Sequence, residues 1–266
     1  MTRQDADVRS AEKDAPSAGS AGRKLREDGW FIWSSETLFE RIGATEKTWS
    51  RFADNWDDLT LDTHMGDGGV YRYRRYGRFG YDADTEELTR ISHHSYFQEA
   101  DVNPLNGGVV RHFDPLTDAF DKDPLLEPLV RTLGEIISAA EGVRRWYVEL
   151  HPVRIVTGNG QLGKPTPQGV HRDGVTYVAT LVTRRTNITG GKSSVYTDDR
   201  ECQQSLTLQP GDFMTFDDRR MLHHVTPVEP IDEGAPASRD VLIVDFTLPD
   251  AGHAARNGLA DPNAQG

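Results

Sequence analysis

Two patterns of hydrophobic and polar residues divide the chain near residue 142. Before it, apolar residues recur three and four positions apart, which is typical of helices that bury one face. After it, short β-branched and aromatic runs alternate with clusters of Gly, Pro and Asp, which indicates strands joined by turns. The predicted strands are 146–157, 175–185, 204–209, 212–216 and 239–248.

The first half contains one well-marked helix and one or two shorter ones. Asp123 as N-cap, Pro124 at the first helical position and Gly142 after the last turn predict the long helix. Ser35 is the candidate N-cap of a second helix within 25–56, where apolar residues again recur at helical spacing.

A short strand is predicted over 70–76, after a glycine-rich turn. Alternation would place Arg72 and Arg74 on one face and Tyr71 and Tyr73 on the other. Two interpretations stay open here: a solvated edge strand, or an arginine that reaches a substrate carboxylate from the wall of a pocket.

Helices followed by strands predict an α+β fold whose C-terminal part, about 146–248, is a β-sandwich or barrel. A chain of 266 residues with no internal repeat fits one domain, expected over 25–248. Residues 1–24 and 249–266 are rich in small and polar residues, so we expect a disordered tail at each end.

Charge and composition narrow the class of protein. The chain carries 30 Lys and Arg against 42 Asp and Glu, a net charge of −12, which disfavours a nucleic-acid partner. No run approaches the roughly 20 apolar residues that span a bilayer, and residues 1–24 lack the apolar core of a secretory signal. With a single cysteine, Cys202, we expect a cytoplasmic protein with no membrane partner.

Candidate metal ligands stand at His171, Asp173 and His223. Residues two apart on an extended segment face the same way, so His171 and Asp173 can reach one ion while Arg172 points elsewhere. Two imidazoles and one carboxylate suit Fe(II) and leave positions open for chemistry. His223 and His224 are adjacent and face opposite sides of an extended segment, so only one of them is expected to bind the metal.

Arg239 begins the last predicted strand, 16 residues beyond His223. It is either a charged strand start or a buried arginine that grips a carboxylate through two parallel hydrogen bonds. The neighbouring candidate metal site favours the second interpretation.

Three segments together carry a resemblance to a known family. These are 165–174, which contains the His-x-Asp pair, 187–191, with two adjacent glycines, and 223–227, with the sequence His-His-Val-Thr-Pro. They resemble the Fe(II)/2-oxoglutarate-dependent dioxygenases and, with 96–108, the bacterial branch that hydroxylates free L-amino acids, including the L-isoleucine hydroxylases. The resemblance spans roughly residues 25–248.

The resemblance implies a double-stranded β-helix (jelly-roll, cupin-like) core and the cosubstrates 2-oxoglutarate and O2 at Fe(II). It implies that His171, Asp173 and His223, rather than His224, bind the iron, and that Arg239 binds the C5 carboxylate of 2-oxoglutarate. The gap before Arg239 is somewhat long for the family. Halogenating relatives replace the carboxylate ligand by a small residue, so Asp173 favours hydroxylation.

The expected reaction is hydroxylation of a free aliphatic or cyclic L-amino acid in secondary metabolism, with release of succinate and CO2. Alternatives are the same chemistry on a carrier-bound amino acid, a peptide or another metabolite, and a non-oxidative cupin-like metal protein. The oligomeric state is not predicted. The candidate substrate-binding residues are Arg74, Arg154, Gln98 and Asn103, and a structural role is equally open for Arg154.

Overall fold

The computed structural model describes residues 17–249. Its helices are α2 (Ala18–Asp28), α3 (Ser35–Ile42), α4 (Glu46–Ala53), the 3-10 helix η1 (Asp54–Asp58), α5 (Asp118–Asp121) and α6 (Leu126–Glu141). Its strands are β1 (Trp30–Trp33), β2 (Thr60–Leu61), β3 (Arg72–Arg74), β4 (Gly77–Asp82), β5 (Glu87–Arg90), β6 (Arg145–Thr157), β7 (Tyr177–Thr186), β8 (Ile188–Gly190), β9 (Ser193–Tyr196), β10 (Cys202–Leu206), β11 (Phe213–Asp217), β12 (Leu222–Val225), β13 (Val228–Pro230) and β14 (Ala237–Thr247).

A large antiparallel sheet organises the molecule. Its strand order is β1-β11-β7-β14-β6-β3-β2, and β4 pairs with β6 and with β5. The central strand β14 pairs along most of its length with β6 on one side and with β7 on the other. Because side chains alternate along a strand, β14 contributes residues to both faces of this sheet.

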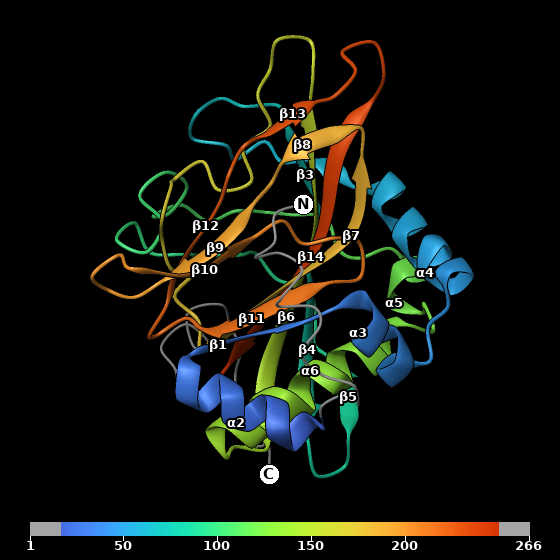
Figure 1. Cartoon of the computed structure of the whole chain (residues 1–266), viewed down its shortest axis with the longest axis vertical. Coiled ribbons are helices and arrows are strands. Elements are labelled where there is room, and N and C mark those ends of the chain that lie inside the picture. The colour runs from blue at the N-terminus through green and yellow to red at the C-terminus, as the bar shows by residue number, and fades with distance from the viewer. Residues whose placement is uncertain (1–16, 250–266) are drawn as a thin grey trace.

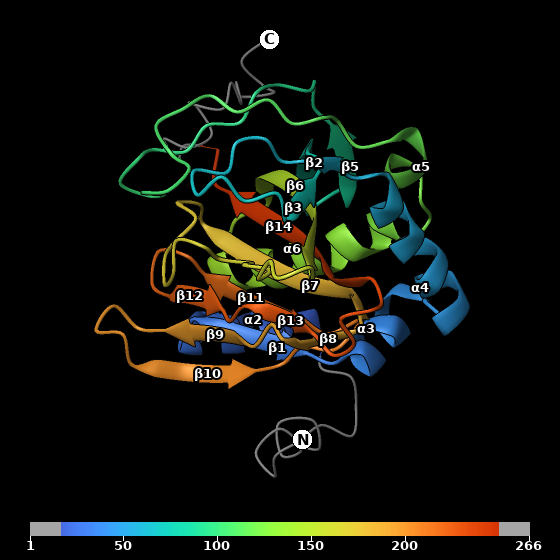
Figure 2. The same cartoon turned by 90° about the horizontal axis from the view of Figure 1, so that it is seen from above.

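One face of the large sheet packs against helices and the other against two small sheets. Leu242 and Val244 of β14 join the core formed with α2, α3, α4 and α6, whereas Val241 joins a second core with residues of β8, β9, β10 and β13. The small sheets have the orders β10-β9-β12 and β13-β8. In Figure 2, β10 and β9 lie toward one margin, and β7 and β14 lie farther in. The expected α+β fold with a jelly-roll-like core is confirmed.

The main helical and strand assignments agree with the sequence patterns, with small differences. Helix α6 begins at Leu126, two residues later than predicted, and ends at Glu141; its C-cap, Gly142, adopts the left-handed conformation (φ 80°). The N-cap of α3 is Ser34 rather than Ser35. The strand β1 was not predicted, because its four residues have no polar position with which to show alternation.

The expected tail over 1–24 is wrong for residues 18–24, which belong to α2; residues 1–16 and 250–266 lie outside the described part. Figure 1 shows α2 running beside α6. The small size of Gly22 permits this close approach, since a Cβ there would lie 2.6 Å from Ala139 Cβ and 2.8 Å from the Ile136 carbonyl oxygen. Residues that suggested disorder by their small size therefore make a tight helix contact.

The strand β3 is not a solvated edge strand. Arg72 and Arg74 are both buried, each with 8% of its surface exposed, and β3 pairs with β2 and β6. Arg72 forms an ion pair of 2.6 Å with the buried Asp62. Among residues 17–249, no helix combines the length and apolar character needed to cross a membrane.

The contact of α2 with α6 predicts opposite effects for two glycines of one helix. Gly22→Ala should lower the free energy of unfolding by about 1–3 kcal/mol, because the added methyl group overpacks the helix interface. Gly19→Ala, whose Cβ would meet only Ser17 Oγ at 3.8 Å, should leave stability unchanged or raise it by up to about 1 kcal/mol. Chemical denaturation measures both, and equal effects would contradict the tight contact.

Candidate metal and cosubstrate site

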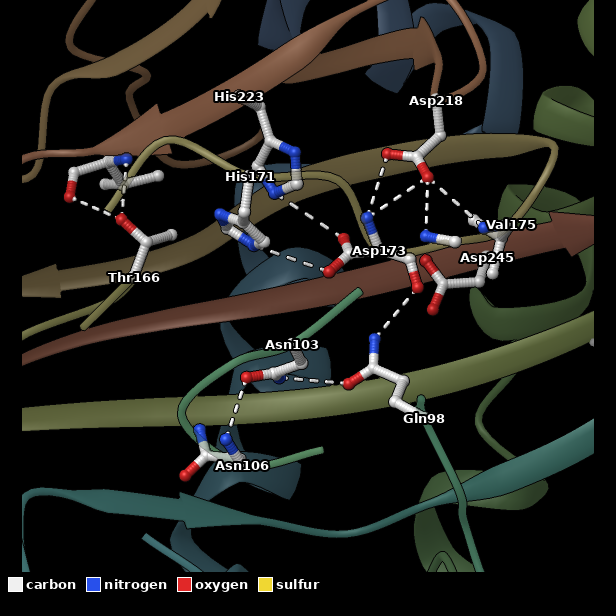
Figure 3. Close-up of polar contacts among 12 residues, drawn as sticks. Gln98, Asn103, Asn106, Thr166, His171, Asp173, Val175, Asp218, His223 and Asp245 are labelled. Atoms are coloured by element: carbon white, nitrogen blue, oxygen red, sulfur yellow. Dashed lines mark hydrogen bonds and ion pairs between the residues drawn. The ribbon is translucent and has the colours of Figure 1, made fainter. Parts of the chain in front are cut away.

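Three side chains converge on one point beside the large sheet (Figure 3). His171 Nε2 lies 3.4 Å from Asp173 Oδ1, and His223 Nε2 lies 3.5 Å from Asp173 Oδ2. One ligand atom from each residue lies within 4.8 Å of the other two, so the group could hold a metal ion. The sequence prediction placed these three residues together, and the structure does the same.

Backbone hydrogen bonds bring the two histidines together. His171 N donates to the His223 carbonyl at 3.1 Å, and His223 N donates to that of His171 at 2.9 Å, which forms an isolated antiparallel bridge. His171 Nδ1 lies 2.9 Å from the Gly169 carbonyl oxygen. Since a carbonyl only accepts, this contact places the ring proton on Nδ1 and leaves Nε2 free to bind a metal.

Asp218, directly after β11, fixes the turn that carries Asp173. Its buried carboxylate accepts hydrogen bonds from the backbone N–H groups of Asp173, Gly174 and Val175, at 2.7–3.2 Å (Figure 3). Asp173 therefore lies on a loop, beyond the bridge at His171, rather than on a regular strand. The two side chains still converge, and Arg172 points away to an ion pair with Asp198.

Burial and charge shift the pKa values of this group. Burial would raise the pKa of Asp173, but the His223 and His171 imidazoles outweigh it and hold that pKa well below its usual range. Burial and then His171 lower the pKa of His223 to about 3. An anionic carboxylate and a neutral imidazole are the protonation states in which these groups bind a metal.

His224 faces away from the group that His223 completes. On β12, His223 is buried and His224 half-buried, and neighbouring side chains of a strand point to opposite faces. Among the described residues, the side chains close enough together to share a metal ion include His223 and not His224. This geometry agrees with the choice of His223.

Arg239 lies on the face of β14 that packs toward the small sheets, and only 1% of its surface is exposed. Its Nε and Nη2 atoms have no hydrogen-bond partner among the described residues. Arg185 stands directly opposite on β7, and its buried Nη1 likewise has none. Burial and then the charge of Arg185 lower the pKa of Arg239 to about 9. A buried and a half-buried cation side by side, each with a buried donor that has no partner among the described residues, are the features expected of an anion site.

A second polar group lies on the same face of the large sheet. Arg74 Nη2 donates to His151 Nδ1, and His151 Nε2 lies 3.2 Å from Asp245 Oδ2. Burial and then Arg74 lower the pKa of His151 to about 3, so its ring is neutral. Burial and then the charge of Asp173 raise the pKa of Asp245 well above its usual range, which places this carboxyl in the electrostatic field of the candidate metal site.

Gln98 joins the buried Arg111 to the metal-site loop, and Asn103 supports Gln98; Figure 3 shows the amides of Gln98 and Asn103. Gln98 Nε2 donates to the Asp173 carbonyl at 2.9 Å, while Gln98 Oε1 accepts from Arg111 Nη2 and from Asn103 Nδ2. Asn103 Oδ1 accepts from the Asn106 N–H. Their amides are already engaged, so both residues act as supports here rather than as free binding groups.

Arg154 does not belong to either group. Its guanidinium binds both oxygens of the buried Asp240 and also Asp57, on the opposite side of β14 from Arg239. These contacts support the structural interpretation of Arg154. Among the four candidates, Arg74 alone keeps a buried donor, Nε, without a partner.

A family model described as 2OG-Fe dioxygenase matches residues 53–245, which is more than half of the chain. The chain belongs to this family. Its members use Fe(II), 2-oxoglutarate and O2, so the protein is a 2-oxoglutarate-dependent non-haem iron dioxygenase.

Individual relatives and solved structures agree with this assignment. L-isoleucine-4-hydroxylase of Bacillus thuringiensis is 27% identical over 67% of this chain and 76% of its own, and 3(1)-hydroxy-L-isoleucine 4-dioxygenase of Pantoea ananatis is 24% identical over 72% and 77%. The crystal structure of a bsmA homolog from Methylobium petroleophilum superposes with a TM-score of 0.80, at 32% identity, covering 88% of this chain and 94% of that one. The structure of IDO from B. thuringiensis has the same fold (TM-score 0.73, 20% identity, covering 90% and 99%).

The side chains at the candidate site fit the iron and the 2-oxoglutarate that the family uses. Two imidazoles and one carboxylate on one side of an ion are the donor set of non-haem Fe(II) oxygenases. The Nε and Nη2 atoms of Arg239 and the Nη1 atom of Arg185, which have no partner among the described residues, offer donors to a dicarboxylate.

Several residues around the site were missed in the sequence. Arg111, Arg185, Asp218 and Asp245 are charged, and charged residues are most often exposed, so nothing local marks their partial or full burial. The alternation along β14 was the available signal for Asp245, since it shares the parity of Arg239 and follows the apolar run 241–244.

The geometry of β12 predicts how two adjacent histidines differ. His223→Ala should weaken Fe(II) binding by at least about 100-fold, more than the roughly 10–100-fold that loss of a supporting outer residue costs. His224→Ala, as the matched control, should bind Fe(II) like the unaltered protein. Anaerobic calorimetric titration measures both affinities, and the reverse order would show that the ligand is His224.

Proposed function

We propose that this enzyme hydroxylates an unactivated C–H bond of a free aliphatic or cyclic L-amino acid and releases succinate and CO2. Two relatives named for the hydroxylation of isoleucine or hydroxyisoleucine support the substrate class. The observation that carries the chemistry is the convergence of His171, Asp173 and His223 on one point.

In this proposal His171, Asp173 and His223 hold Fe(II). When bound, the iron with 2-oxoglutarate and O2 supplies the oxidising power, and the protein supplies position. The backbone bridge between the histidines and the three N–H donors to Asp218 keep the ligands in place. Retention of the carboxylate at Asp173 supports hydroxylation rather than halogenation.

Arg239 binds the distal carboxylate of 2-oxoglutarate in this proposal, and Arg185 assists it. The three buried nitrogen atoms without partners on these side chains supply the support. Gly191 leaves room beside them, since a Cβ there would lie 3.0 Å from Arg185 Nη1 and 3.1 Å from Arg239 Cδ. A dicarboxylate would satisfy donors whose burial is otherwise costly.

A single protein preparation tests the reaction in two stages. Anaerobic apoprotein with Fe(II) and 2-oxoglutarate should show a visible charge-transfer band. On admission of O2, at least one of L-isoleucine, L-leucine, L-valine and L-proline should stimulate succinate formation and yield a product heavier by one oxygen atom. D-isoleucine serves as the control for recognition of the α-carbon.

The outcomes separate the alternatives. A band without stimulation by any free amino acid would overturn the proposed substrate class and favour a carrier-bound amino acid, a peptide or another metabolite. Absence of the band in folded protein would overturn the assigned iron and cosubstrate residues.

Substitution of the two arginines of the cosubstrate site should weaken 2-oxoglutarate binding to different extents. Arg239→Met should raise the KM for 2-oxoglutarate by at least about 30-fold, because truncation of a buried partner of a charged pair costs about 2–5 kcal/mol. Arg185→Met should raise it by about 10-fold, since Arg239 remains. Arg184→Met, whose side chain instead binds Asp240 and Asp57, is the matched control and should leave this KM unchanged. An equal KM for Arg185→Met and the unaltered enzyme would remove Arg185 from the site.

A further inference from the structure

Two buried arginines lie together beside the candidate metal site with donors left over. Arg74 and Arg111 expose 8% and 1% of their surfaces, and the Nε atom of each has no hydrogen-bond partner among the described residues. Each guanidinium lies against aromatic rings: Arg74 is 3.9 Å from the Phe113 centroid, and Arg111 is 4.8 Å from that of Tyr96. The ring faces orient the cations without neutralising them.

Asp62, which directly follows β2, does not neutralise this pair. Its carboxylate is engaged by Arg72 at 2.6 Å and by the backbone N–H of His64. Arg111 Nη2 binds the neutral amide of Gln98. Two cations in a buried position therefore call for an anion, and no carboxylate of residues 17–249 forms an ion pair with either of them.

An acidic group lies one imidazole ring away from Arg74. His151 accepts from Arg74 through Nδ1, and its Nε2 faces Asp245 Oδ2 at 3.2 Å. Asp245 Oδ1 is buried and has no hydrogen-bond partner among the described residues. A free acceptor thus lies a short distance from the free donors.

We propose that Arg74 and Arg111 bind the α-carboxylate of the amino-acid substrate and that Asp245 receives its ammonium group. This inference rests on the proposed function and names the head-group subsite of the same active site. The carboxylate and the ammonium group of an α-amino acid lie on the same carbon, so an amino acid with one hydrogen bond of about 3 Å at each end spans a short distance. That distance is similar to the one that the His151 ring and its two contacts span between Arg74 and Asp245.

The subsite is joined directly to the metal-site loop. Gln98 accepts from Arg111 at one end of its amide and donates to the Asp173 carbonyl at the other, with both distances at 2.8–2.9 Å. The guanidinium that holds the substrate carboxylate is therefore fixed relative to Asp173. This link sets the distance from the α-carbon to the reacting centre, which determines the carbon that is attacked.

Paired changes of protein and ligand test the assignment. The Fe(II)- and 2-oxoglutarate-loaded enzyme is titrated with L-isoleucine, with its methyl ester, which lacks the carboxylate charge, and with 2-hydroxy-3-methylpentanoate, which lacks the ammonium group. The variants are Arg74→Met, Arg111→Met and Asp245→Asn, together with Arg74→Lys and Arg111→Lys. The control is Arg75→Met, since Arg75 follows Arg74 but binds the Asp58 and Pro115 carbonyls.

We expect each Arg→Met variant to raise the KM for L-isoleucine by about 30-fold or more. The affinity of each variant for the methyl ester should equal that of the unaltered enzyme for the same ester. Asp245→Asn should raise the KM for L-isoleucine but not for the hydroxy acid. Retention of the charge-transfer band shows that each variant is folded, and the lysine variants should recover part of the affinity. Arg75→Met should behave like the unaltered enzyme.

Two results would overturn the subsite. If the arginine variants lose as much affinity for the methyl ester as for L-isoleucine, the arginines do not bind the carboxylate. If Asp245→Asn loses equal affinity for L-isoleucine and for the hydroxy acid, Asp245 does not bind the ammonium group. A failure of the proposed function can be distinguished, because the unaltered enzyme would then show the charge-transfer band but no succinate formation stimulated by any amino acid. That result would overturn the proposed subsite as well.

Discussion

The candidate iron site depends on one buried carboxylate that does not face the metal position. Asp218 gathers the N–H groups of three consecutive residues, and these residues form the turn that presents Asp173. A carboxylate that accepts several backbone hydrogen bonds fixes the chain more firmly than side-chain packing alone. The bridge between His171 and His223 closes the other side of the site, so all three side chains are placed by main-chain geometry.

The large sheet separates two different environments on its two faces. Along β14, Leu242, Val244 and Phe246 pack toward the helices, while Arg239 and Asp245 share the opposite face. The helical face supplies the apolar burial that stabilises the fold, and the other face carries charged groups that cost stability when they lack partners. Such costs are accepted where they serve binding or catalysis.

Sequence patterns identified the strands β6, β7, β10, β11 and β14, helix α6 and the metal triad, because each rests on a strong local signal: alternation, a capped apolar stripe, or a His-x-Asp pair with a distant histidine. The short strands β8, β9 and β13, the tight contact of Gly22 and the charged residues Arg111, Arg185 and Asp245 carry no such signal. The roles of these residues depend on which strands become neighbours, and pairing between strands distant in the chain cannot be predicted from a short segment of sequence. Arg154 shows the converse, since a strand arginine looks the same in sequence whether it faces a pocket or an ion pair.

The cross-strand pair of Arg239 and Arg185 has a consequence for the life of the protein in the cell. Arg239 is buried and Arg185 half-buried, so two neighbouring cations lower the stability of the fold, and a ligand that pairs with both binds only the folded chain. By mass action, such a ligand at 100 times its Kd adds about 2.7 kcal/mol to the free energy of unfolding. The supply of a central metabolite would then govern how long the enzyme survives proteolysis as well as how fast it turns over.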